Sequence, residues 1–168
     1  VKFIRYAQYC IEKNGQGIVS FITPNKYMEN TTFRGMRWSV FKSFSKAYII
    51  NLHGNSKEGE VSDENVFDIQ QGVAITILVK NCNNSNFSIK YIDINGDRNN
   101  KYNWLNSHNI FDINSTIPLV EPYYFFMPIL SNAESKYDNG FLTSELFPVN
   151  SAGIVTSDDK VLTSDNRE

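Results

Sequence analysis

Two short runs of residues carry the side chains that could do chemistry in this 168-residue chain. The first run, Pro24, Asn25, Lys26 and Tyr27, follows an apolar segment at residues 17–23. A lysine can meet a phosphate and a tyrosine can stack on a nucleobase, so this run has the side chains of a nucleic-acid contact. The alternative is an ordinary strand-to-helix turn with a partly buried tyrosine.

The second run starts where the next apolar segment ends, and it contains His53 and Asn55. Together with Lys57 and Glu58 these residues could line a cleft that faces DNA, although a solvated turn explains them equally well. A metal centre is not indicated, because His53 and His108 have no carboxylates or thiols beside them at ligand spacing.

Both runs are expected at one edge of an α/β sheet. Apolar residues at helical spacing predict helices at 1–13 and 31–44, and apolar runs predict strands at 17–23, 46–52 and 72–79. A right-handed crossover makes the first two strands parallel, and the third strand is most simply antiparallel, although periodicity alone permits other arrangements. Open α/β sheets bind ligands beyond the carboxyl ends of their parallel strands, where both runs would lie.

The predicted helices carry an apolar face and a charged face. The apolar face of the first helix consists of Phe3, Ile4, Ala7, Cys10 and Ile11. The second helix is expected to begin at Thr31 or Thr32, either of which can cap it. Arg34 and Arg37 share a face of that helix and are interpreted as solvated.

Beyond residue 80 the pattern is less regular. Residues 87–94 alternate like a half-exposed strand that extends the sheet, and the asparagine-rich residues 99–109 are interpreted as a polar loop. Residues 104–117 are ambiguous. The aromatic residues 123–126 indicate core or interface, and residues 140–147 indicate a short helix. The polar tail from Thr163 is expected to fray.

Charge and cysteine content narrow the function classes. The chain has 16 basic and 18 acidic side chains, a formal net charge of −2, so any DNA contact is expected to be local or shared with other segments. Cys10 and Cys82 form no CxxC, which favours a reducing, cytoplasmic compartment. No membrane span or signal peptide is evident. The start at Val1, already inside a helical pattern, suggests a piece of a longer parent.

Several segments resemble one enzyme family. They are VKFIRYA at the start, GIVSFITPNKYM, YIINLHGN followed by NVFDIQQGVAI, and, more patchily, PYYFFMPI and FPVNSAGIVTSDD. These are similar to the C-terminal half of the methyltransferase domain of adenine-N6 DNA methyltransferases of the gamma, Asn-Pro-Pro-Tyr class, as found in single-chain restriction–modification enzymes. The similarity is strongest over residues 1–80.

The resemblance implies the second half of a Rossmann-like S-adenosylmethionine-dependent methyltransferase sheet, with a β-containing extension. Residues 1–95 would belong to the methyltransferase domain and residues 96–168 to an extension toward a target-recognition domain. The implied parent methylates adenine N6 in double-stranded DNA after flipping the base out of the duplex. The chain contains no Asn-Pro-Pro-Tyr motif, no glycine-rich FxGxG loop and no nuclease constellation. No catalytic residue is therefore assigned, and this piece is expected to be inactive without the N-terminal half of the domain.

The resemblance also implies roles for two phenylalanines. Phe3 lies where the family places an aromatic ring against the cofactor adenine, and the alternative is a core residue on an amphipathic helix. Phe67 lies near an aromatic residue that stacks on the flipped adenine. Simpler relatives have that residue near the far end of the following strand, where this chain has Val79, so packing is the favoured interpretation of Phe67.

Two functions of other classes remain open. One is a stand-alone DNA-recognition or protein-interaction module without catalysis, which would need a basic surface. The other is a structural piece that self-associates, because half of a parallel sheet leaves an open edge that recruits partners.

Overall fold

The computed structural model of the chain describes residues 2–55, 63–81, 86–128, 140–141 and 143–149. The chain divides into two units, Val1–Ile129 and Leu130–Glu168. Within the described part of the second unit the helix α5 (Thr143–Leu146) forms, which confirms the short helix predicted there. The division of the chain near residue 95 stays a prediction.

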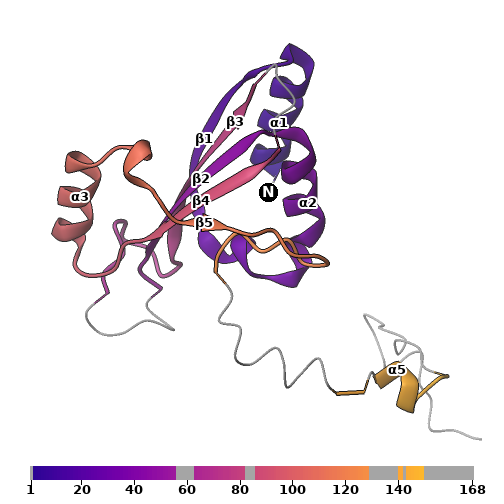
Figure 1. Ribbon diagram of the computed structural model, residues 1–168. Coiled ribbons are helices and arrows are strands. Elements are labelled where there is room, and N and C mark those ends of the chain that lie inside the picture. Colours follow the sequence, from indigo (N-terminus) through magenta and orange to yellow (C-terminus); the bar gives the residue numbers. More distant parts are fainter. Residues whose placement is uncertain (1, 56–62, 82–85, 129–139, 142, 150–168) are drawn as a thin grey trace, which may run out of the picture. The chain divides into compact units, whose positions relative to one another are not determined.

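A five-stranded mixed sheet forms the centre of the first unit (Figure 1). Its strands are β1 (Gly17–Pro24), β2 (Lys46–His53), β3 (Val73–Lys80), β4 (Ser88–Asp93) and β5 (Thr116–Ile117). The order across the sheet is β1-β3-β2-β4-β5. The strand β3 is antiparallel to both β1 and β2, whereas β4 is parallel to β2 and β5 is antiparallel to β4.

This arrangement confirms the three predicted strands and their directions. The strands β1 and β2 run the same way, and β3 lies reversed between them. The strand predicted at 87–94 is confirmed as an extension of the sheet through β4. Six consecutive residues of β2 are buried, as expected for a central strand that is covered on both faces.

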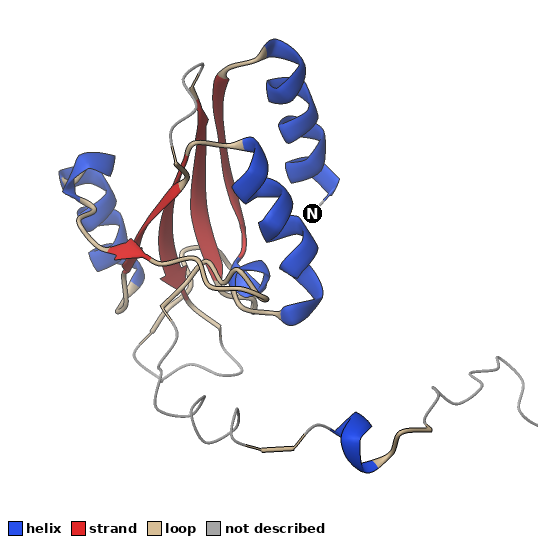
Figure 2. Cartoon of the chain, turned by 45° about the vertical axis from the view of Figure 1, so that its right-hand side comes forward, coloured by secondary structure: helices blue, strands red, loops and turns tan. Residues whose placement is uncertain are grey.

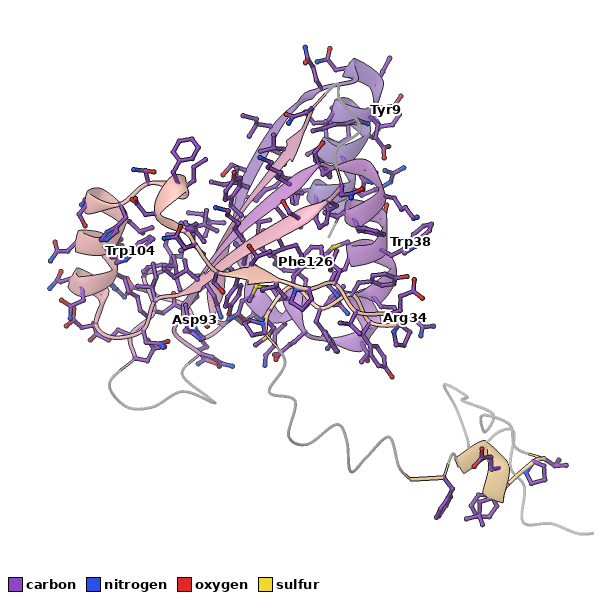
Figure 3. All side chains as sticks on the ribbon, viewed as in Figure 1. Tyr9, Arg34, Trp38, Asp93, Trp104 and Phe126 are labelled. Atoms are coloured by element: carbon purple, nitrogen blue, oxygen red, sulfur yellow. The ribbon has the colours of Figure 1, made fainter. Side chains whose placement is uncertain are left out.

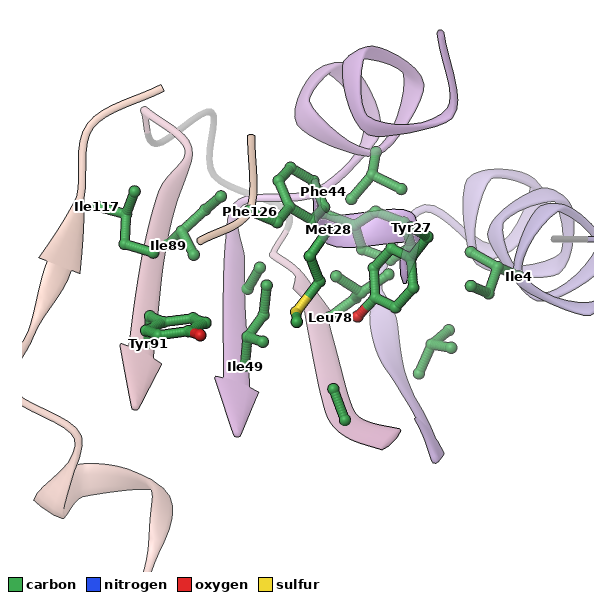
Figure 4. Close-up of a cluster of buried hydrophobic side chains, with 14 residues drawn as sticks. Ile4, Tyr27, Met28, Phe44, Ile49, Leu78, Ile89, Tyr91, Ile117 and Phe126 are labelled. Carbon is green, nitrogen blue, oxygen red and sulfur yellow. The ribbon is translucent and has the colours of Figure 1, made fainter. Parts of the chain in front are cut away.

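Helices cover the two faces of the sheet. Figures 1 and 2 show α1 (Lys2–Asn14) and α2 (Arg34–Ser43) side by side over one face, and α3 (Arg98–Ser107) over the other. The buried side chains between the sheet and α1 and α2 include Ile4, Tyr27, Met28, Ile49 and Leu78 (Figure 4). A second cluster packs the opposite face of the sheet against Trp104 and Leu105 of α3.

The expectation of a polar loop at residues 99–109 was wrong, because α3 occupies most of that stretch. The Asp97 side chain caps the helix by accepting a hydrogen bond from the Asn100 backbone at 2.8 Å. Trp104 and Leu105 pack on the sheet, and Lys101 is completely buried. Because this helix has few apolar residues, its stability comes mainly from these contacts with the rest of the fold and not from an apolar periodicity in its sequence.

The predicted helix faces also needed correction. On α1 the buried residues are Ile4 and Gln8, whereas Phe3 is 79% exposed and Cys10 is exposed. The Gln8 amide reaches between the helices and donates to the Ser39 hydroxyl at 2.9 Å, which accounts for a polar residue on the packed face. The core interpretation of Phe3 was therefore wrong.

The start of α2 also differs from expectation. The Asn30 side chain accepts from the Thr32 backbone at 2.9 Å and caps a 3-10 turn, Thr31–Phe33, that leads into α2. The solvated interpretation of Arg37 was wrong, since this side chain is completely buried, whereas Arg34 is exposed (Figure 3).

The strand β1 forms one edge of the sheet. The outer strand β1 carries no charged residue and exposes Ile18 and Ile22, so self-association through this edge stays a prediction.

Cys10 is a free thiol, and Cys82 lies outside the described residues. Within the ranges that the structure describes, no helix is both long and apolar enough to cross a bilayer, and His, Cys, Asp and Glu side chains form no metal-binding group of three or more.

Candidate functional site

A polar cavity of about 220 Å³ opens where β1 and β2 end. Its walls come from the loop after β1, the end of β2 and the residues after it, and a distant segment near residue 127. The lining residues are Asn25, Lys26, Met28, Glu29, Asn51, His53, Asn55, Asp63 and Met127. Asp93, the last residue of β4, lies at the same end of the sheet (Figure 3).

The amide of Asn51 joins β2, β4 and the loop after β1 at this cavity. Asn51 is only 2% exposed, although it sits in an apolar strand. Its Oδ1 accepts from Asn25 Nδ2 at 3.1 Å, and its Nδ2 donates to the Tyr91 hydroxyl at 3.0 Å and to Asp93 Oδ1 at 3.1 Å. A buried amide with this many partners sets the positions of the residues around it.

His53 and Asp93 form a hydrogen-bonded pair within this network. His53 Nε2 lies 2.6 Å from Asp93 Oδ1, and the Tyr91 hydroxyl donates to the same oxygen at 2.5 Å. Burial acts to raise the pKa of Asp93, but the hydrogen bonds from His53 and Tyr91 outweigh it and hold the pKa below its ordinary value of 3.8. Burial and the neighbouring Asp93 carboxylate raise the pKa of the Tyr91 hydroxyl. Asp93 is therefore ionised at neutral pH and Tyr91 keeps its proton.

Local backbone geometry directs His53 into the cavity. The pairing of β2 with β3 shifts register between Asn51 and His53, and His53 has a φ of 51°. Gly54 follows with a φ of 80°, and a Cβ on it would lie 2.4 Å from Asn65 Cα. This close approach requires glycine at position 54.

Lys101 holds the loop that follows His53. Its ammonium group, on α3, donates to the backbone carbonyl of Leu52 at 2.7 Å, to Asp63 Oδ1 at 2.7 Å and to the Glu64 carbonyl at 2.6 Å. Asp63 also accepts from the backbone of Gly54 at 2.8 Å. Burial acts to raise the pKa of Asp63, but these donors together lower it. A buried lysine with three oxygen partners thus ties both ends of the loop to α3.

Arg37 supports the opposite wall of the cavity. Its guanidinium donates to the carbonyls of Tyr27 at 2.7 Å, Asn30 at 2.8 Å and Tyr123 at 2.8 Å. The backbone of the buried Phe126 donates to the Met28 carbonyl at 3.0 Å. These bonds fasten the segment around residues 123–127 against the loop after β1, and so they position the methionines of the cavity wall. Of the aromatic cluster predicted as core or interface, Phe126 is buried, whereas Tyr123 is 40% exposed.

The structure brings four of the predicted site residues together. Asn25, Lys26, His53 and Asn55 all line the cavity, although they come from two loops. The ammonium group of Lys26 pairs with the Glu29 carboxylate at 3.0 Å. Pro24, which precedes them, is exposed as the last residue of β1.

Three predicted site residues lie elsewhere. Tyr27 is only 5% exposed, its hydroxyl meets that of Thr76, and burial raises its pKa to about 12, so stacking on a base would require its ring to leave the core. Phe67 is 43% exposed rather than packed, and it does not line the cavity. The ring of Phe3 is exposed on α1.

The sequence analysis missed Asn51, Asp63, Asp93 and Lys101. Asn51 had a usable signal, because an asparagine inside the apolar run YIINL must find hydrogen-bond partners if the strand is buried. Asp93, at the end of an alternating strand, had a weaker one. Nothing local distinguishes Lys101 or Asp63 from solvated charges.

Parts of three solved structures are similar to this chain. The chain has a TM-score of 0.64 and 27% sequence identity to a nuclease-deletion mutant of the Type ISP restriction–modification enzyme LlaGI in complex with a DNA substrate mimic, covering 73% of this chain and 12% of that one. This chain is similar to part of a restriction–modification enzyme. The ATP-dependent Type ISP enzyme LlaBIII bound to DNA gives a TM-score of 0.64 and 28% identity over 79% of this chain and 9% of that one.

A DrdV–DNA complex determined by cryo-EM is similar to the same extent. Its TM-score is 0.63 and its identity 27%, over 71% of this chain and 12% of that one. The chain thus spans about a tenth of the length of these three proteins. No protein-family model and no curated protein matches the chain.

Proposed function

We propose that this chain is part of an S-adenosylmethionine-dependent DNA adenine-N6 methyltransferase within a restriction–modification enzyme, and that the cavity at the end of β1 and β2 faces DNA. The observation that carries the proposal is the likeness to LlaGI, LlaBIII and DrdV, each in a complex with DNA or a DNA mimic. The match spans about a tenth of each of those chains, so the chain corresponds to one part of a large enzyme.

The sheet supports the methyltransferase part of the proposal. The reversed strand β3 lies between the parallel strands β1 and β2, which is the arrangement that the family resemblance implies for the trailing half of the sheet. The resembling segments GIVSFITPNKYM and YIINLHGN contribute β1 and β2 and the residues at their carboxyl ends. Ligands of open α/β sheets bind at this edge.

The cavity supports the DNA-facing part. Three amide side chains, Asn25, Asn51 and Asn55, line it with His53, and amides can pair with base edges. The described lining residues carry no excess of positive charge, so phosphate contacts would come from other parts of the enzyme. Lys26 at the cavity and the exposed residues Pro24 and Phe67 remain proposed DNA contacts.

The chain alone does not form a complete methyltransferase site. S-adenosylmethionine supplies the transferred methyl group in this family, and only Phe3 is assigned to it here. The exposed ring of Phe3 could pack on a planar ring, but the sequence has neither the glycine-rich loop nor the Asn-Pro-Pro-Tyr motif. Methyl transfer therefore requires residues from outside these 168.

Complementation tests the proposal. The chain is assayed with tritiated S-adenosylmethionine and plasmid DNA, alone and together with a polypeptide that carries the glycine-rich loop and the Asn-Pro-Pro-Tyr motif. We expect no incorporation by the chain alone and label in N6-methyladenine when both parts are present. Methyl transfer by the isolated chain, or a correctly associated pair that labels no adenine, would contradict the proposal.

A further inference from the structure

The two ring nitrogens of His53 have different surroundings. Nε2 lies 2.6 Å from Asp93 Oδ1, which is ionised at neutral pH and can only accept a hydrogen bond. Nε2 must therefore carry the proton of the neutral ring. Nδ1 makes no hydrogen bond with the described residues, and the imidazole, whose side chain is 32% exposed, lines the cavity. Neutral His53 thus offers Nδ1 to the cavity as an acceptor.

The charges around the ring indicate which ligand this acceptor suits. Among the described residues, the carboxylates of Glu29, Asp63 and Asp93 lie at the cavity or beside His53. The ammonium group of Lys26 pairs with Glu29 and that of Lys101 with Asp63. Because both ammonium groups already meet carboxylates, these surroundings favour a hydrogen-bond donor over a phosphate. Amino groups at base edges are such donors, and neighbouring amides can pair with the same edges.

We propose that His53 accepts a hydrogen bond through Nδ1 from the amino group of a nucleobase, and that Asp93 is a positioning residue that fixes the ring in the Nε2–H form. This inference rests on the proposed function, since it names the group of the DNA that the cavity takes. The groups that face His53 are Asn51 of its own strand, Tyr91 and Asp93 of β4, Asn25, Lys26 and Glu29 of the loop after β1, and Asn55 and Asp63 of the loop after β2.

The proposal predicts the sign of a pH effect. Protonation of His53 places a hydrogen on Nδ1, which converts the acceptor into a donor that repels an amino group. The His53 contact therefore requires the neutral ring and is lost when the ring is protonated at lower pH. A phosphate contact would show the opposite sign, because the imidazolium cation would strengthen it.

The ring nitrogens can be observed directly by NMR of the ¹⁵N-labelled chain. We expect His53 to be protonated at Nε2 at neutral pH. His108 is an internal control of opposite form, because its Nδ1 lies 3.0 Å from the Trp104 carbonyl and must donate to it. In Asp93→Asn the preference of His53 for the Nε2–H form should fall while His108 is unchanged, and Asp93→Glu should restore it. An Nδ1–H form of His53 in the wild-type chain overturns the proposal.

The contact itself is tested by fluorescence anisotropy with a labelled duplex of about 20 base pairs at low salt. We expect His53→Gln to weaken binding near pH 7.5 by about twofold to tenfold, the range of one hydrogen bond, with His108→Gln unchanged. Lowering the pH should bring the two affinities together. Equal DNA affinities of wild type and His53→Gln near pH 7.5 would overturn the His53 contact. The same follows if wild type binds more tightly than His53→Gln by a factor that grows as the pH is lowered. Either result would leave the proposed DNA binding of the cavity untouched. No binding by any variant in the presence of the complementing half would instead count against the proposed function, and the contact would fall with it.

Discussion

Replacing the buried ammonium group of Lys101 with an apolar side chain should destabilise the fold strongly. Lys101→Met keeps the length of the side chain but leaves the Asp63 carboxylate without its cation and the carbonyls of Leu52 and Glu64 without a donor. Removing one partner of a buried ion pair costs about 3 to 5 kcal/mol. At roughly 2 to 4 °C per kcal/mol for a chain of this size, about 3 kcal/mol corresponds to a fall in Tm of roughly 6 to 12 °C.

Urea unfolding monitored by circular dichroism measures the change, and Trp104 fluorescence reports on α3 itself. The matched control is Lys46→Met, which makes the same substitution at an exposed position at the other end of β2. In the double variant Lys101→Met, Asp63→Asn the buried charge is removed together with its partner. The double variant should therefore lose less free energy of unfolding than the two single variants lose together.

Two results would refute this reasoning. The first is that Lys101→Met lowers the free energy of unfolding no more than the Lys46→Met control does. The second is strict additivity of the Lys101 and Asp63 changes, which would mean that the ion pair across the loop does not contribute to folding.

Three further outcomes are expected. Because the folded-state pKa of Asp93 is depressed below 3.8, its stabilisation is complete above that pH and is lost as the pH falls through the folded pKa. Asp93→Asn should therefore flatten the acid limb of stability measured by urea unfolding, and an unchanged limb would contradict this. Gly54→Ala should cost more than about 1 kcal/mol, because it combines a φ of 80° with a Cβ 2.4 Å from Asn65, and a neutral effect on Tm would show that the turn can relax. Arg37→Met should lower the free energy of unfolding by about 3 kcal/mol or more, because it leaves three carbonyls without their donor. Arg34→Met, at an exposed position, should change the free energy of unfolding by no more than about 0.5 kcal/mol. Equal effects of the two substitutions in urea unfolding would refute the structural role of Arg37.

Much of the sheet could be predicted from the sequence because its signals are local. The runs at residues 17–23, 46–52 and 72–79 are apolar and bounded by turn residues, and each became a strand. By contrast, α3 was taken for a loop, because its asparagine-rich sequence has little periodicity and its stability comes from contacts with the sheet.

The candidate site was predicted in part for the same reason. Residues that end a strand can be located from the strand, so Asn25, Lys26, His53 and Asn55 were correctly placed at one edge. The exposure of individual rings could not be derived in this way. Tyr27 is buried in the core, whereas Phe3 is exposed. Which side chains of a helix or turn are buried depends on the surface that the element packs against.

The sequence by itself determined the three apolar strands and the edge at which polar side chains gather, because hydrophobic periodicity is a local signal. It permitted several arrangements of those strands, of which the observed directions are one. Only the tertiary structure decided the partners of those side chains. Asp93 meets His53 because Asn51 pairs with Asp93 in the register of β2 and β4. Lys101 reaches Asp63 because α3 packs where the loop after β2 returns. Such partners lie about 40 residues apart in the chain, and their contact depends on the packing of whole elements rather than on any local pattern.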